Sequence, residues 1–121
     1  MRNYQKLDAW KVSMQLAKTV YTFTKDFPKE ELYGLSSQIK RAAVSIPANI
    51  AEGMGRQYKK DTIQFLHIAR GSAYELETLF HMAVEINILA DQNFKQFLIL
   101  IDDSIKLLNG LINYLEKADL K

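Results

Sequence analysis

The feature that most constrains this chain is an almost uninterrupted helical periodicity. Only two prolines and five glycines occur in 121 residues, and the apolar residues between them recur every three or four positions, without β-type alternation. We therefore expect an all-α fold with helices over Leu7–Lys25, Leu35–Gly55, Lys60–Ile88 and Asp91–Ala118. The connections are short, so successive helices should be antiparallel neighbours in an up-down-up-down four-helix bundle. Pro47 predicts a kink in the second helix, because proline removes a backbone hydrogen bond.

Two of the predicted helices carry apolar lines with alternating steps of four and three residues. In the fourth helix the line is Phe94, Leu98, Ile101, Ile105, Leu108, Ile112 and Leu115. In the third helix it is Phe65, Ala69, Ser72, Leu76, Leu79, Ala83 and Ile86. This spacing is typical of left-handed helix bundles, so we expect both lines to face the core.

The length and composition are those of one ordinary globular domain, which we expect to span residues 1–121. There is no cysteine, which excludes disulfides, thiolate zinc sites and cysteine nucleophiles. The first residues lack the apolar stretch of a signal peptide, and the longest strongly apolar run, Phe97–Ile101, is too short to span a bilayer. We therefore expect a cytoplasmic protein with no membrane partner.

Motifs for catalysis or for a bound cofactor are missing from the sequence. A di-metal carboxylate bundle needs Glu-x-x-His pairs, and none occurs here. Glu77, His81 and Glu85 share a face, but it lies opposite the apolar line of the third helix. Neither a hydrolytic triad nor a Gly-rich phosphate loop is indicated. The chain is therefore expected to be no enzyme and to hold no metal or cofactor.

The first and fourth helices carry more apolar surface than one bundle core requires. Each apolar arc is roughly 200° wide, whereas a bundle helix needs a stripe only a little over 100° wide. A large apolar patch usually marks a protein interface, and a second copy of the chain is the simplest partner. The predicted interface residues are Val12, Leu16, Val20, Phe23, Leu100, Leu107, Leu111 and Tyr114. The alternative is that these are scattered surface side chains, which are common in single copies.

A polar line follows the second helix. Its members are Gln38, Arg41, Ser45, Asn49, Glu52 and Arg56. It is either a solvated face or a partly buried hydrogen-bond network that fixes helix register or lines a groove between subunits. Residues at equal distance from the turn near Gln57 should lie at the same height, which places Arg41 level with Glu75 on the third helix. We therefore predict an ion pair between Arg41 and Glu75 beside the core.

The charge is unevenly distributed along the chain. Residues 1–60 hold 11 Lys and Arg against 5 Asp and Glu, a net charge of +6, whereas residues 61–121 hold 5 against 9, a net charge of −4. Lysines recur every seven residues on the first helix, and further cations lie near the turn between the second and third helices. The candidate nucleic-acid contacts are Lys11, Lys18, Lys25, Arg56, Lys59 and Lys60, because such side chains neutralise phosphates. The alternative is an ordinary solvated face.

The string RAAVSIPANIAEG at residues 41–53 is the most specific motif in the chain. It is accompanied by Phe27–Leu35, by Ala69–Glu77 and by the Ala9-Trp10 pair. Together these segments resemble the four-helix-bundle family of 23S rRNA intervening-sequence proteins over the whole chain. The resemblance implies an up-down bundle that forms pentameric rings, with genes often inserted in bacterial 23S rRNA loci. It also implies kinship with the accessory variability protein of diversity-generating retroelements, a basic pentamer that binds nucleic acid and a reverse transcriptase.

The functional expectation is a ring-forming, non-catalytic accessory or scaffold that associates with RNA or DNA. The alternative is a scaffold that binds only an unidentified protein. A steep salt dependence of nucleic-acid affinity would favour the first interpretation, and no binding at low salt would favour the second.

Overall fold

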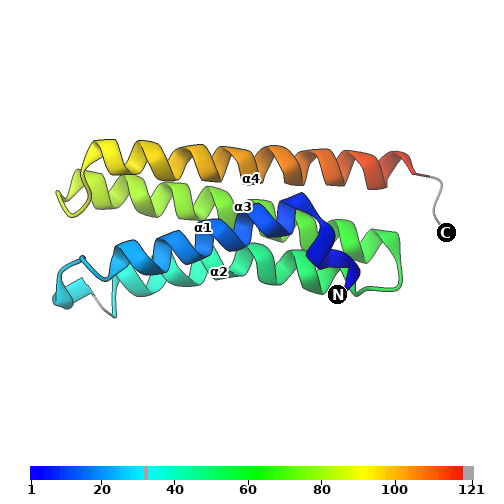
Figure 1. Ribbon diagram of the computed structural model, residues 1–121, viewed down its shortest axis with the longest axis horizontal. Coiled ribbons are helices and arrows are strands. Elements are labelled where there is room, and N and C mark those ends of the chain that lie inside the picture. The colour runs from blue at the N-terminus through cyan, green and yellow to red at the C-terminus, as the bar shows by residue number, and fades with distance from the viewer. Residues whose placement is uncertain (32, 119–121) are drawn as a thin grey trace.

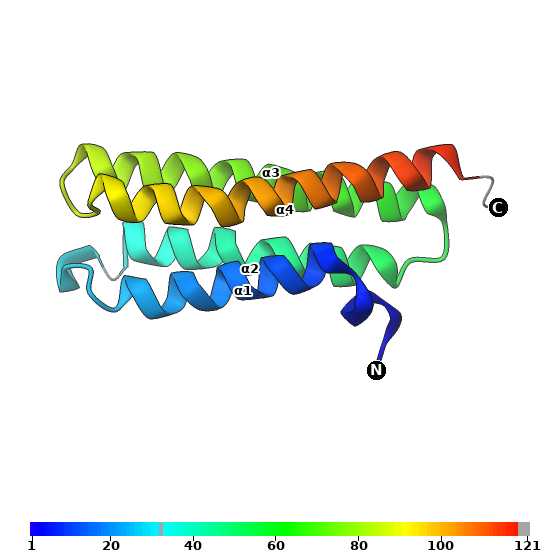
Figure 2. The same cartoon turned by 45° about the horizontal axis from the view of Figure 1, so that its top comes forward.

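Four long helices dominate the computed structural model, which describes residues 1–31 and 33–118. The helices are α1 (Asp8–Thr24), α2 (Leu35–Met54), α3 (Lys59–Glu85) and α4 (Asp91–Lys117), and short 3-10 turns lie at Asn3–Lys6 and Lys29–Glu31. The described residues form no strand, so the predicted all-α four-helix bundle is confirmed. The α1–α2 and α3–α4 connections lie at one end of the bundle and the α2–α3 connection at the other (Figures 1 and 2).

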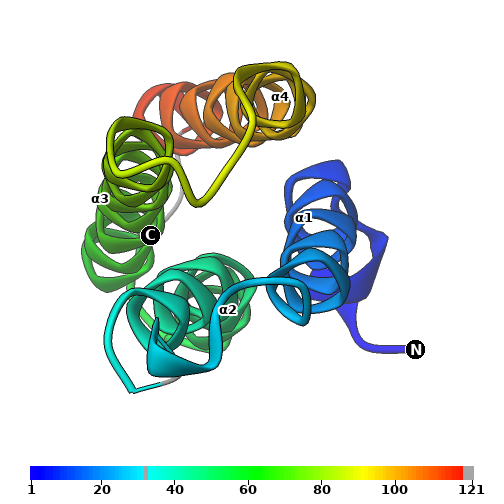
Figure 3. The same cartoon turned by 90° about the vertical axis from the view of Figure 1, so that its left-hand side faces the viewer.

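Viewed along its length, the bundle has two layers (Figure 3). Helices α1 and α2 form one layer, and α3 and α4 form the other, with α4 lying next to α1. Residues 1–58, which contain α1 and α2, hold 9 Lys and Arg against 5 Asp and Glu, a net charge of +4, and residues 59–121 hold 7 against 9, a net charge of −2. The uneven charge of the sequence therefore becomes a difference between the two layers of the bundle.

Helix α3 ends at Glu85, three residues earlier than the sequence indicated. Asn87 adopts a left-handed conformation, with φ of 63°. The backbone N–H of Ile88 donates to the carbonyl of Ala83 at 2.9 Å, and that of Asn87 donates to Val84 at 3.0 Å. This is the Schellman pattern of helix ends, in which asparagine replaces the more usual glycine.

The core confirms the predicted line of α4 and most of that of α3, where Ala69, Ser72, Leu76 and Ala83 are buried. All seven residues of the α4 line are buried except Leu98, which is half-buried. Ile86, however, lies beyond the end of α3 and is exposed, and the fully buried residues of α3 also include Leu66, Ala73 and Phe80. The Phe80 ring stacks on Phe97 of α4 with centroids 4.5 Å apart. The inward face of α3 is therefore wider than the predicted line and includes the Phe80 ring.

Helices α2 and α3 approach each other closely near their connection. A Cβ atom placed on Gly53 would lie 2.7 Å from the Cβ of Phe65 and 3.1 Å from the carbonyl oxygen of Thr62. Only a residue without a side chain fits at this distance. Pro47 is buried within α2, which is helical on both sides of it; the kink at this residue stays a prediction.

Candidate nucleic-acid interface

The lysine row of α1 lies beside a groove between α1 and α2. Lys11 and Lys18 are exposed and line this groove, whose volume is about 580 Å³. Its floor and walls are mainly apolar and include Trp10, Met14, Tyr21, Val44 and Pro47. Burial of the proline and partial burial of the tryptophan leave a shallow apolar surface bordered by positive charge.

The positive charge continues toward the α1–α2 connection. Lys25 lines a smaller hollow of about 200 Å³ together with Lys29 and Lys40. Lys40 and Arg41 line another shallow hollow with Tyr21 and Tyr33. We call this surface the basic face and define it by six residues: Lys11, Lys18, Lys25, Lys29, Lys40 and Arg41.

Tyr21 lines two of these hollows and also a third, which lies between α2 and α3. Its side chain is 47% exposed, and the Lys40 ammonium lies 5.5 Å from the ring centroid. Tyr21 was not among the functional residues predicted from the sequence. The available signal was an aromatic residue between Lys18 and Lys25, since aromatic rings among cations are typical of surfaces that bind single-stranded nucleic acid.

The polar line of α2 divides into a hydrogen-bonded part and a solvated part. The hydroxyl oxygens of Ser45 and Ser72 lie 2.8 Å apart and link α2 to α3. The Asn49 side-chain amide donates to the Ser45 carbonyl at 2.8 Å and to its hydroxyl at 2.9 Å. Gln38, Arg41 and Glu52 are exposed. Both interpretations therefore apply, each to a different part of the line.

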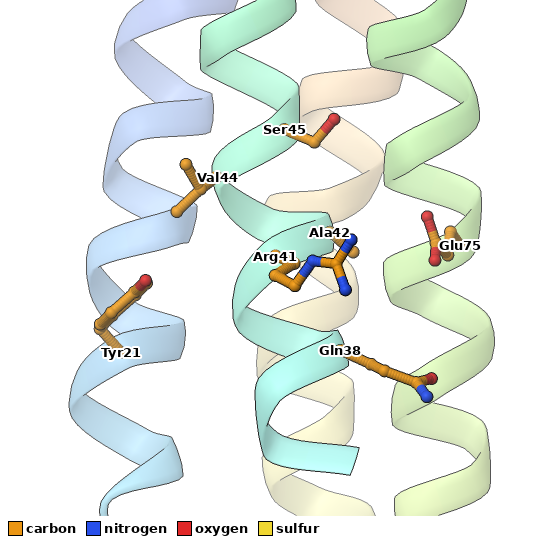
Figure 4. A pocket seen from close by; sticks show the side chains of 7 residues that line it. All are labelled: Tyr21, Gln38, Arg41, Ala42, Val44, Ser45 and Glu75. Carbon is orange, nitrogen blue, oxygen red and sulfur yellow. The ribbon is translucent and has the colours of Figure 1, made fainter. Parts of the chain in front are cut away.

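The predicted ion pair between Arg41 and Glu75 is wrong. No nitrogen of Arg41 lies within 4.0 Å of a Glu75 oxygen, although both side chains are described. The two residues instead line one groove of about 600 Å³ together with Gln38, Ser45 and Tyr21 (Figure 4). Both are exposed, and an exposed pair gains under ~1 kcal/mol, which does not offset the entropy of fixing two long side chains.

The cations near the α2–α3 connection are less available than those of the basic face. Arg56 pairs with Glu52 at 3.1 Å and lies 4.5 Å from the centroid of the Phe65 ring. The Lys59 ammonium donates to the carbonyl of Ala118 at 3.0 Å. Lys60 is exposed. Two of these three predicted contacts are therefore engaged within the chain.

The predicted self-association surface is largely internal packing. Leu16 and Val20 are fully buried in the chain's own core, so the prediction that they contact a second copy is wrong. The residues of α1 that the sequence predicted at the interface lie on the side of the helix that faces the core. Five other members are half-buried, namely Val12, Phe23, Leu100, Leu107 and Leu111, and Tyr114 is 67% exposed.

The histidines take part in local contacts on α3. His81 Nε2 lies 3.8 Å from Glu77 Oε2, and His67 Nδ1 lies 2.8 Å from the guanidinium of Arg70. Arg70 also donates to Asn109 of α4 at 2.6 Å. Among the residues that the structure describes, no group of three potential metal ligands comes together, and no helix has the length and apolar character needed to cross a bilayer.

The fold and this surface define an all-α bundle whose basic face is interrupted by aromatic and apolar grooves. The profile described as 23S rRNA-intervening sequence protein matches residues 5–110, and the chain belongs to this family. A solved structure from Bacteroides thetaiotaomicron, described as a protein with unknown function from the S23 ribosomal protein family, is 25% identical with a TM-score of 0.81. The similarity covers 87% of this chain and 95% of that one. A search of curated proteins found no match.

Proposed function

We propose that this chain is a non-catalytic cytoplasmic accessory that binds RNA through the basic face. The observation that carries the proposal is the position of exposed Tyr21 among hollows bordered by Lys11, Lys18, Lys40 and Arg41. Lysine and arginine neutralise phosphates and release counterions, which supplies affinity without sequence preference. An exposed ring among them offers a stacking surface for an unpaired base.

A protein-binding scaffold is the second candidate. Met14 and Val44 are exposed apolar side chains of the α1–α2 groove, and Trp10 extends this apolar surface. Such a surface suits a protein partner as well as a nucleobase. The response to salt separates the two candidates, because contacts with phosphates weaken steeply as salt increases.

The test is a salt titration of binding to a labelled single-stranded RNA. The variant replaces Lys11, Lys18 and Lys25 with glutamate, and the control replaces the exposed α4 residues Lys95, Lys106 and Lys117 in the same way. Both variants change the net charge equally. Each lost phosphate contact should reduce the slope of log affinity against log salt by about 0.7 for a single strand.

We expect a reduced slope only in the α1 variant. Equal losses in both variants would mean that net charge, and not the basic face, controls binding. Absence of binding by the unaltered protein at low salt would overturn the proposed function and favour the scaffold.

We further infer that the chain self-associates, as the family resemblance implies, and that a ring of copies multiplies the field of one basic face. Tyr114 is the most exposed member of the predicted interface. Tyr114→Glu should lower the molar mass measured by light scattering, whereas Ile68→Glu, on exposed α3 surface, should not. A monomer at micromolar concentration of the unaltered protein would contradict self-association.

A further inference from the structure

The groove between α2 and α3 contains polar groups that the protein itself does not satisfy. Among the described residues, no hydrogen bond or ion pair involves the side chains of Gln38, Arg41 or Glu75. Figure 4 shows Gln38 and Arg41 extending from α2 toward α3, where Glu75 faces them. Tyr21 lies on the opposite side of Arg41, on α1. From α3 to α1, the groove therefore presents a hydrogen-bond acceptor at Glu75, a planar cation at Arg41 and an aromatic ring at Tyr21.

A carboxylate in a surface that binds RNA cannot contact phosphates, because like charges repel. Glu75 can only accept hydrogen bonds, so its partner in RNA must be a ribose 2′-hydroxyl or a donor on a nucleobase. Unpaired bases are commonly recognised by hydrogen bonds to their Watson–Crick edges. A 2′-hydroxyl offers the carboxylate one donor, whereas a base edge can offer two, so the acidic residue favours a position where the protein reads a base.

The bases differ in how well they suit a carboxylate. Guanine presents two adjacent donors, N1–H and the N2 amino group, which match the two oxygens of Glu75. Adenine and cytosine present one amino group beside an acceptor, and uracil presents one N–H between two carbonyls. The carboxamide of Gln38, in the same groove, supplies a donor for the carbonyl oxygen of guanine.

Arg41 and Tyr21 accommodate the neighbouring nucleotide. An arginine fork binds a phosphate through two parallel hydrogen bonds, and Arg41 lies between Glu75 and Tyr21 in Figure 4. A phosphate on Arg41 would have one nucleotide on each side. The base on the α1 side would meet the exposed Tyr21 ring, where Lys40 adds positive charge.

We propose that the groove formed by Gln38, Arg41 and Glu75 recognises an unpaired guanine in a single RNA strand, with the adjoining base stacked on Tyr21. The proposal rests on the proposed function, since it assigns a base preference to the same RNA-binding face. It predicts that the basic face, which otherwise binds RNA with little sequence preference, discriminates among bases at one nucleotide position.

The test compares three labelled heptanucleotides: oligouridine, the same strand with a central guanosine, and the same strand with a central inosine, which lacks the N2 amino group. Binding is measured by fluorescence anisotropy at one low salt concentration. Guanosine should increase affinity about tenfold over uridine, in the range of one well-formed bidentate contact. Inosine should recover only part of that gain.

The diagnostic variant is Glu75→Gln, and the control is Glu85→Gln, which makes the same charge change at an exposed position of α3. Glu75→Gln should abolish the guanosine preference while oligouridine binding stays the same or becomes tighter, and Glu85→Gln should keep the preference. Equal affinity of the unaltered protein for all three strands, or a preference that survives Glu75→Gln, would overturn the guanine assignment and leave RNA binding intact. Failure to bind any strand would overturn the proposed function as well.

Discussion

Replacing Gly53 with alanine tests the close approach of α2 and α3. The added Cβ would lie 2.7 Å from the Phe65 Cβ and 3.1 Å from the Thr62 carbonyl oxygen. Both atoms are fixed to the α3 backbone, so the helices must move apart instead of a side chain rotating away. Overpacking of this kind costs about 1–3 kcal/mol, and the higher helix propensity of alanine returns up to ~1 kcal/mol.

We therefore expect Gly53→Ala to have a free energy of unfolding about 1–3 kcal/mol lower than that of Gly110→Ala, since the gain in helix propensity is common to both. Gly110→Ala is the matched control, because a Cβ there meets no atom within 4 Å. That substitution should raise stability by up to ~1 kcal/mol. Urea denaturation followed by far-UV circular dichroism measures both values. If Gly53→Ala proved as stable as Gly110→Ala, the two helices would not be in the close contact described.

Two further predictions concern buried hydroxyl groups. The Ser104 hydroxyl is fully buried and has no hydrogen-bond partner among the described residues, so Ser104→Ala should raise the urea midpoint by an amount equivalent to about 1 kcal/mol; a lower midpoint would mean that the hydroxyl is satisfied. Ser45 and Ser72 should show a coupling energy of at least ~0.5 kcal/mol in a double-mutant cycle to alanine, because their hydroxyls are 2.8 Å apart, and strictly additive effects would argue against this link.

The sequence determined the number and extent of the helices well, because helical periodicity depends only on spacing. It did less well on which face of each helix points inward. Helix α3 carries apolar side chains on several faces, so the line through Phe65 and Ile86 competed with the one through Leu66 and Phe80. Spacing alone does not separate two neighbouring lines, since the choice depends on how the large rings of α3 and α4 fit together.

The same limit explains the errors in the candidate sites. The wide apolar arc of α1 was recognised, but its inward half, with Leu16 and Val20, was assigned to a partner copy. Register placed Arg41 and Glu75 at one groove, yet register does not fix the ends of long exposed side chains. The Ser45 link to Ser72 was within reach of the sequence, because both residues belonged to lines already recognised on their helices.

The separation of charge between the layers gives the molecule an electric dipole with a component directed across the bundle. In the field of a polyanion such a dipole experiences a torque, which turns the α1–α2 layer toward the strand before any contact forms. Fewer encounters then begin with the acidic layer. This orientation increases the rate of association more than the affinity. Salt screens the effect when the protein and the polyanion are farther apart than the Debye length, which is about 8 Å at physiological salt.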